Sequence, residues 1–82
     1  MRDKTPLQGQ YLAFIDAYST LNGVAPAERD LERYFRVTPP TIHQMILTLA
    51  RDGHISRVPG HARSIRLVVP REELPRLEPV SK

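Results

Sequence analysis

The stretch TPPTIHQMILTLARDGHI, from Thr38 to Ile55, constrains the fold more than any other part of the chain. Thr38 is a favourable N-cap for a helix, and a proline follows it where a missing N–H costs nothing. Apolar residues then recur at helical spacing, which predicts one buried face. Gly53 ends the helix because glycine tolerates positive φ. The stretch therefore predicts a short, capped helix over 38–52 and a strand that begins directly after it.

The two faces of this expected helix differ in chemistry. Ile42, Ile46 and Leu49 share the inner face, which we expect to belong to the core. No Asp or Glu occurs between Glu32 and Asp52. The opposite face carries Pro40, Thr41, Gln44, Leu47, Thr48 and Arg51, with His43 at its edge. A short helix with an acid-free polar face is typical of the recognition helix of a DNA-binding protein.

Two further helices are predicted before this one. The first covers 5–22, with threonine and proline at its start and glycine after its end. The second covers roughly 27–35, and its acids Glu28 and Asp30 lie in the first turn, where they complement the helix dipole. Only residues 36–38 separate it from the next helix, which is the short connection of a helix-turn-helix.

Downstream of Gly53 the apolar period changes from helical to two. A short strand begins at Ile55, Pro59–Gly60 form a turn, and a second strand covers 64–69. The residues of this strand that share its apolar face are Ile65, Leu67 and Val69. The pattern therefore predicts a hairpin over 55–69, called the wing below, that packs an apolar face onto the helices.

Together these elements predict a fold that is mainly α with a small antiparallel β-hairpin, in the order α-α-α-β-β. This is the order of a winged helix-turn-helix, and we assign it to a single domain over residues 1–69. From Pro70 onward the chain is rich in proline and lacks periodicity. We expect 70–82 to be an extended or disordered tail.

Basic residues are concentrated in the second half of the chain. The net charge is only +3, but residues 31–71 hold seven arginines against Glu32 and Asp52. Arginine is suited to forked contacts with phosphate or guanine. Such clustering creates a directed positive field, which favours a polyanionic partner such as nucleic acid.

The sequence predicts no catalytic centre, no cofactor and no metal site. It has no cysteine, which excludes disulfides, cysteine-based zinc sites and thiol catalysis. Its four glycines are isolated, so no glycine-rich phosphate loop is present. His43, His54 and His61 lie 11 and 7 residues apart, a spacing that fits no usual zinc pattern. We therefore expect no enzyme, and no pocket of the usual ligand size in so small a fold.

No segment predicts a membrane location. The longest apolar runs are a few residues, far short of the roughly 20 that cross a bilayer. Arg2 and Lys4 are not followed by the apolar region of a signal peptide. We expect a cytoplasmic protein that is associated with the nucleoid when it is bound to DNA.

Four stretches together carry a resemblance to a known family: TPLQGQYLAFIDAY, VAPAERDLERYF, VTPPTIHQMILTLARDGHISR and HARSIRL. Over about residues 4–69 the chain resembles the N-terminal DNA-binding domain of LexA-type repressors and related short winged-helix regulators. The resemblance implies binding of double-stranded DNA, with the third helix in the major groove and the wing over a phosphate backbone. LexA-type repressors also carry a self-cleaving protease domain, for which these 82 residues leave no room, so we expect no switching by self-cleavage.

Carried over position by position, the resemblance places the base-reading residues early in the third helix, at Pro40, Thr41, His43 and Gln44. Gln44 can pair with adenine, Thr41 can touch a thymine methyl group or donate to a phosphate, and His43 can donate to guanine N7 or to a phosphate. The expected phosphate contacts are Thr38, Thr48, Arg36, Arg51, Arg57, His61, Arg63 and Arg66. Arg36 stands where the family has a glycine, so a left-handed turn there would carry a side-chain cost.

Alternatives remain open from the sequence alone. The arginines of the wing contact phosphate or form a solvated strand face, and exposed Leu47 packs on the wing or belongs to a partner surface. A winged helix can also be a protein-interaction module that uses its third helix or the C-terminal tail. For the DNA-binding interpretation, one module covers a modest footprint, so a homodimer on a two-fold operator is expected to be possible.

Overall fold

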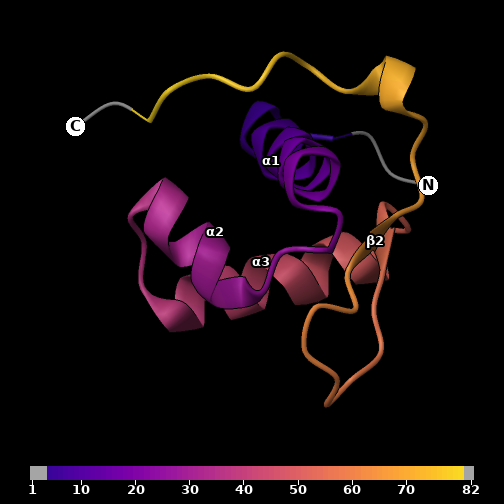
Figure 1. Cartoon of the computed structure of the whole chain (residues 1–82). Coiled ribbons are helices and arrows are strands. Elements are labelled where there is room, and N and C mark those ends of the chain that lie inside the picture. Colours follow the sequence, from indigo (N-terminus) through magenta and orange to yellow (C-terminus); the bar gives the residue numbers. More distant parts are fainter. Residues whose placement is uncertain (1–3, 81–82) are drawn as a thin grey trace.

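The computed structural model describes residues 4–80 (Figure 1). Three helices are followed by two short antiparallel strands and one turn of 3₁₀ helix, so the predicted fold class and element order are confirmed. The elements are α1 (Pro6–Asn22), α2 (Glu28–Phe35), α3 (Pro39–Arg51), β1 (Ile55–Ser56), β2 (Arg66–Leu67) and η1 (Arg71–Glu73). Residues 1–3 of the predicted domain and 81–82 of the predicted tail lie outside the described residues.

Local chemistry explains the start of α1 and the end of α3 but not the start of α3. At the start of α1, Thr5 and Gln8 form a reciprocal capping box, with backbone-to-side-chain distances of 3.1 Å in both directions. At the end of α3, the His54 N–H donates to the Leu49 carbonyl, and Gly53 adopts a φ of 84°. The exception is Thr38, which occupies the N-cap position of α3 but makes no side-chain hydrogen bond to the helix backbone.

The core lies where the three helices and the wing meet. Leu12, Leu31 and Ile46 are completely buried, and so are the predicted inward residues Ile42 and Leu49 of α3. The ring of Tyr11 stacks on Phe35 at a centroid distance of 4.2 Å, which fastens α1 to α2. From the wing, the buried residues are Ile55, Ile65 and Val69. The predicted apolar faces of α3 and of the second strand are therefore confirmed.

The connection between α2 and α3 turns through a left-handed residue. Arg36 has φ 58° and ψ 47°, and its N–H donates to the Glu32 carbonyl at 2.8 Å. This is the conformation that glycine would adopt without steric cost, and a side chain there costs about 1–2 kcal/mol. Residue 36 therefore adopts the left-handed turn for which the sequence predicts a side-chain cost.

The wing is mostly loop, with less strand than the sequence predicts. Ladder pairing is confined to Ile55 with Leu67 and Ser56 with Arg66, so the second strand is shorter than the predicted 64–69. The tip is closed instead by the Ser64 hydroxyl, which accepts from the Val58 N–H at 2.9 Å and lies 3.2 Å from its carbonyl. At the tip, hydrogen bonds from the Ser64 side chain take the place of backbone ladder pairs. The alternation of apolar residues in the sequence gives no sign of such a substitution.

The segment after Val69 contains η1 and then runs extended along α1 (Figure 1). Gln10 holds it through both ends of its amide, donating to the Arg76 carbonyl at 2.9 Å and accepting from the Glu78 N–H at 2.8 Å. The Tyr34 hydroxyl donates to the Glu78 carbonyl at 2.8 Å, and Leu77 packs against the core. These contacts attach the segment to α1 and α2. The boundary that we place between residues 69 and 70 stays a prediction.

Candidate nucleic-acid interface

The outer face of α3 is an exposed surface without an acidic residue of its own. Pro40, Thr41, His43, Gln44 and Leu47 are all exposed, and Thr48 is half-buried. A shallow hollow of 450 Å³ is lined by Pro40, Thr41, Gln44, Met45 and Thr48. The structure therefore brings three of the four predicted base-reading residues to one hollow and places His43 at the other edge of the face.

The start of α3 offers few backbone donors. Pro39 and Pro40 lack an N–H, and the Ile42 N–H donates to the Thr38 carbonyl at 3.2 Å. Only the Thr41 N–H is left in the first turn, beside the hydroxyl groups of Thr38 and Thr41, which lie 3.0 Å apart. A phosphate at this helix start would therefore be bound mainly by the helix dipole and the two hydroxyl groups, with a single backbone N–H as a further donor.

His43 is in contact with an acid of the neighbouring helix. Its Nδ1 lies 3.2 Å from both carboxylate oxygens of Glu28, the first residue of α2. The side chains are 52% and 31% exposed, respectively, so the pair lies at the surface. From the sequence, Glu28 is expected only to complement the dipole of its own helix. The contact with His43 could not be predicted, because two residues 15 positions apart on different helices leave no pattern in the sequence.

The side chains of six arginines make no hydrogen bond or ion pair with any described residue. Arg51, at the end of α3, has its Nε 3.2 Å from the carboxylate of Asp52 but remains 67% exposed. His61 is exposed at the wing tip. The six arginines without such a side-chain partner are Arg29, Arg33, Arg36, Arg57, Arg66 and Arg76. Three of these six, Arg36, Arg57 and Arg66, belong with Arg51 to the predicted phosphate contacts, and their guanidinium groups remain available to an anionic partner.

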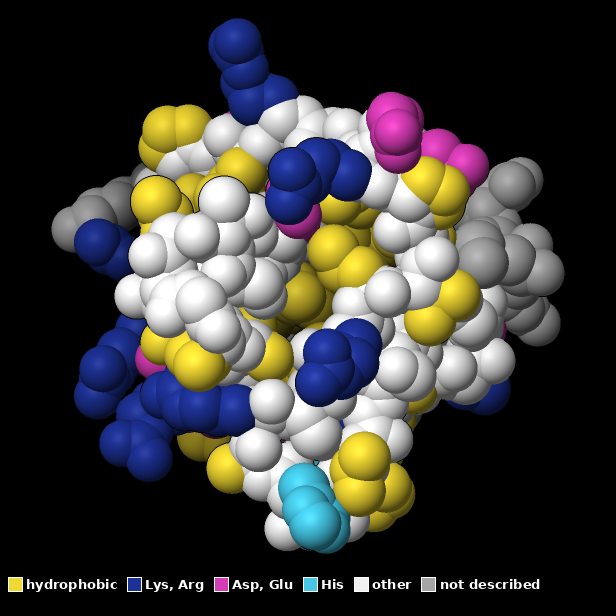
Figure 2. Space-filling view, turned by 45° about the vertical axis from the view of Figure 1, so that its right-hand side comes forward, with side chains coloured by type: hydrophobic (Ala, Val, Ile, Leu, Met, Phe, Trp, Pro, Cys, Tyr) yellow, Lys and Arg dark blue, Asp and Glu magenta, His cyan; other side chains and the backbone are white. Residues whose placement is uncertain are grey.

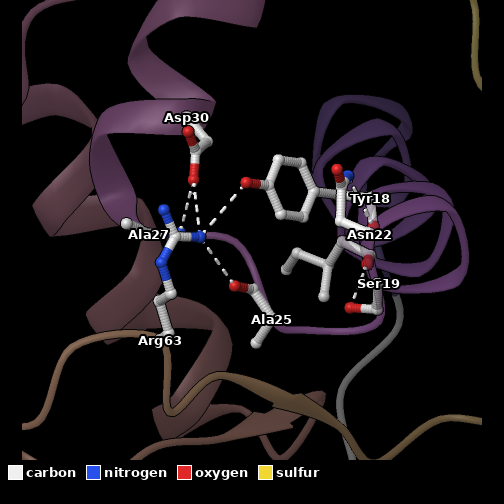
Figure 3. Close-up of polar contacts among 8 residues, drawn as sticks. Tyr18, Ser19, Asn22, Ala25, Ala27, Asp30 and Arg63 are labelled. Atoms are coloured by element: carbon white, nitrogen blue, oxygen red, sulfur yellow. Dashed lines mark hydrogen bonds and ion pairs between the residues drawn. The ribbon is translucent and has the colours of Figure 1, made fainter.

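Arg63 has a different position from the one that the sequence suggests. Its Nη1 donates to the Tyr18 hydroxyl and the Ala25 carbonyl, both at 3.1 Å, and to Asp30 Oδ2 at 3.2 Å (Figure 3). The hydrogen bond with Tyr18 is the main reason why the pKa of Arg63 is raised. These internal contacts compete with the predicted role of Arg63 as a phosphate contact, which stays a prediction. Arg63 fastens the wing to the end of α1 and the start of α2.

Behind the wing lies an open hollow with a hydrophobic floor. Figure 2 shows such a hollow with basic side chains around it. The hollow between α1, the 23–25 loop and β2 measures 590 Å³, and Ile15, Ile65 and Leu67 are among its lining residues. This corrects the expectation that a fold of this size has no pocket in the range of ligand sites.

Within residues 4–80, no group of three or more histidine, cysteine or acidic side chains is placed to hold a metal ion. In the same part of the chain, no helix is both long and apolar enough to cross a membrane.

Comparisons with known proteins bear on this surface. The family model described as the LexA DNA binding domain matches residues 1–64. The LexA repressor of Thermosipho africanus is 40% identical over 68 residues, which cover 83% of this chain and 34% of the relative. The LexA repressors of Thermosipho melanesiensis (36% over 74 residues) and Geobacter metallireducens (35% over 69 residues) are similar to it as well. The alignments cover 90% and 83% of this chain and 37% and 34% of these two relatives. The chain thus spans about a third of the length of the curated relatives that it matches.

Proposed function

This chain belongs to the LexA DNA-binding domain family, and from that premise we propose that it binds double-stranded DNA and represses transcription. The observation that carries the proposal is the outer face of α3, which is exposed and has no acid of its own. Arginines without internal partners precede and follow this helix, at Arg36 and Arg57. A helix of this kind fits the major groove, and flanking cations fit the phosphates at the groove edges.

Sequence reading is assigned to the first half of α3. Gln44 has the amide geometry for a paired contact with adenine N6 and N7. Pro40 and the methyl group of Thr41 can contact a thymine methyl group. Both line the same hollow as Gln44, so the three side chains address neighbouring base pairs.

Phosphate contacts are assigned to groups on either side of that face. Arg36 and Thr38 lie before α3, and Thr48 and Arg51 lie in its second half. In the wing, the assigned groups are Arg57, His61 and Arg66. These contacts carry no base information and set the orientation of α3 on the duplex.

The small size of the module favours binding as a dimer. A single winged helix covers few base pairs and discriminates weakly among genomic sites. We propose that two copies bind a two-fold operator, each with its α3 in one half-site. Repression would follow from occupancy of such an operator in the cytoplasm, at the nucleoid.

The test is selection of bound duplexes from a randomised pool, followed by salt titration of the selected sequence. We expect a two-fold symmetric consensus and an affinity that falls by roughly 10³ or more between about 50 and 200 mM salt, for six or more phosphate contacts. Equal binding of every duplex would overturn sequence-specific repression. Absence of binding at low salt would favour the competing function, a protein-interaction module that uses α3 or the C-terminal segment.

A further inference from the structure

We infer that Glu28 determines which bases His43 can read, because it fixes the position of the proton on the imidazole ring. The inference rests on the proposed binding of α3 in the major groove. It adds a residue of α2 to the specificity of that helix, although Glu28 need not touch the DNA.

The geometry of the pair sets the tautomer. His43 Nδ1 lies 3.2 Å from each of the two carboxylate oxygens of Glu28. An ionised carboxylate only accepts hydrogen bonds, so Nδ1 must carry the proton in this contact. In a neutral imidazole one nitrogen donates and the other accepts. Nε2 of neutral His43 is therefore a hydrogen-bond acceptor.

The place of Glu28 on the surface supports a role beyond its own helix. Together with Arg57, His61 and Arg63, it lines a cleft of 290 Å³ between the start of α2 and the wing. The other acid of this turn, Asp30, accepts from Arg63 and from the Ala27 N–H. Glu28 instead contacts His43. An acid beside Arg57 and His61, two of the proposed phosphate contacts, weakens DNA binding by repulsion. The orientation of His43 gives Glu28 a function at this position in spite of that repulsion.

The consequence concerns the identity of one base. Nε2 of His43 has no hydrogen-bond partner among the described residues, and the side chain is 52% exposed. In the major groove an acceptor pairs with the adenine N6 or cytosine N4 amino group, whereas a donor pairs with guanine N7 or O6, adenine N7 or thymine O4. Neutral His43 should therefore select adenine or cytosine through Nε2, in place of the guanine contact that the residue type alone suggests.

The first test measures the tautomer in the free protein and needs no DNA. Nitrogen chemical shifts of the His43 ring are recorded at alkaline pH, where imidazole is neutral. In the unsubstituted chain we expect Nδ1 to be protonated and Nε2 to be bare. In Glu28→Ala we expect a shift toward protonated Nε2. A protonated Nε2 in the unsubstituted chain, or equal shifts in both proteins, would overturn the inference.

The second test measures base selection at alkaline pH with duplexes that differ only at the base pair next to His43. We expect Glu28→Ala to change the ratio of affinities for cytosine against guanine by about tenfold. Glu32→Ala is the matched control, because it removes the same charge from the same helix, and it should leave the ratio unchanged. An unchanged ratio in Glu28→Ala would overturn the inference. If the protein bound no DNA, the proposed function would fail while the tautomer measurement still stood.

Discussion

Nη1 of Arg63 lies 3.2 Å from Oδ2 of Asp30, and this contact joins the wing to the first turn of α2. The same carboxylate oxygen accepts from the Ala27 N–H at 2.8 Å. One acid therefore holds both the start of a helix and the position of the wing. The Arg63 backbone has a φ of 57°, a left-handed conformation that a non-glycine side chain adopts at a cost. The hydrogen bonds of its guanidinium group offset that cost (Figure 3).

Arg63→Ala should release the wing without removing a phosphate contact. We expect faster amide exchange in the wing and weaker binding to all duplexes alike, because the wing cations lose their fixed position. The slope of log affinity against log salt should stay unchanged, since the number of neutralised phosphates stays the same. Hydrogen exchange and salt titrations of binding check the two expectations.

Arg66→Ala is the comparison for this result. Its side chain is exposed and has no partner among the described residues, so we expect the salt slope to fall by about one. A slope that fell equally in Arg63→Ala would show that Arg63 leaves Asp30 to contact phosphate when DNA binds.

Gln44→Ala should reduce affinity for the selected duplex by about 1–3 kcal/mol and relax the preference at the base pair it contacts. Alanine is the best helix former, so the substitution should not destabilise α3. Competition between the selected duplex and duplexes altered at single positions measures the effect. A uniform loss on every duplex would assign Gln44 to the phosphate backbone and remove it from base reading.

Arg36→Gly should raise the free energy of unfolding by about 1 kcal/mol, because glycine adopts the left-handed turn before α3 without steric cost. Chemical denaturation measures the change. Arg33→Gly is the matched control, since it removes the same side chain from the last turn of α2 and should destabilise the protein by about 1 kcal/mol. Loss of stability in both variants would indicate that the Arg36 side chain stabilises the fold in another way.

The helices and the core could be predicted because they depend on local pattern. The spacing of Ile42, Ile46 and Leu49 identified the buried face of α3, and Gly53 identified its end. The outer face followed from the same period. Base-reading roles for residues on that face still rest on chemistry and resemblance, so they stay predictions.

The contacts that determine what each charged residue does could not be predicted. Glu28 and His43 lie 15 positions apart, and Arg63 and Tyr18 lie 45 apart. A hydrogen bond between distant side chains produces no periodicity, and the sequence showed each residue only as a charge on a surface. The attachment of the C-terminal segment to α1 could not be predicted either. The Gln10 amide bonds to backbone groups of Arg76 and Glu78, and every residue carries such groups, so the side chains at 76 and 78 give no signal.

Gln10→Ala should detach that segment from α1, because the variant loses both hydrogen bonds of the Gln10 amide. We expect faster exchange of the Glu78 amide and faster tryptic cleavage after Arg76, with global stability lowered by no more than about 1–2 kcal/mol. Asn22→Ala is the control, since its amide donates to Tyr18 on the same helix and does not contact the segment. Protection of Glu78 that persisted in Gln10→Ala would show that the packing of Leu77 and the bond from Tyr34 suffice.

His54→Leu should stabilise the protein. His54 is completely buried, and neither ring nitrogen has a hydrogen-bond partner among residues 4–80, so folding removes two polar atoms from water without compensation from these residues. Such burial costs about 1–3 kcal/mol by mutational measures, and leucine fills a similar volume without that cost. The backbone bond from the Val68 N–H to the His54 carbonyl is unaffected by the substitution. Thermal and chemical denaturation of His54→Leu should therefore show a gain of about 1 kcal/mol, while His61→Leu at the exposed wing tip should show little change. Destabilisation by His54→Leu would mean that the ring is bonded in solution, for instance to a buried water between the end of α3 and β2.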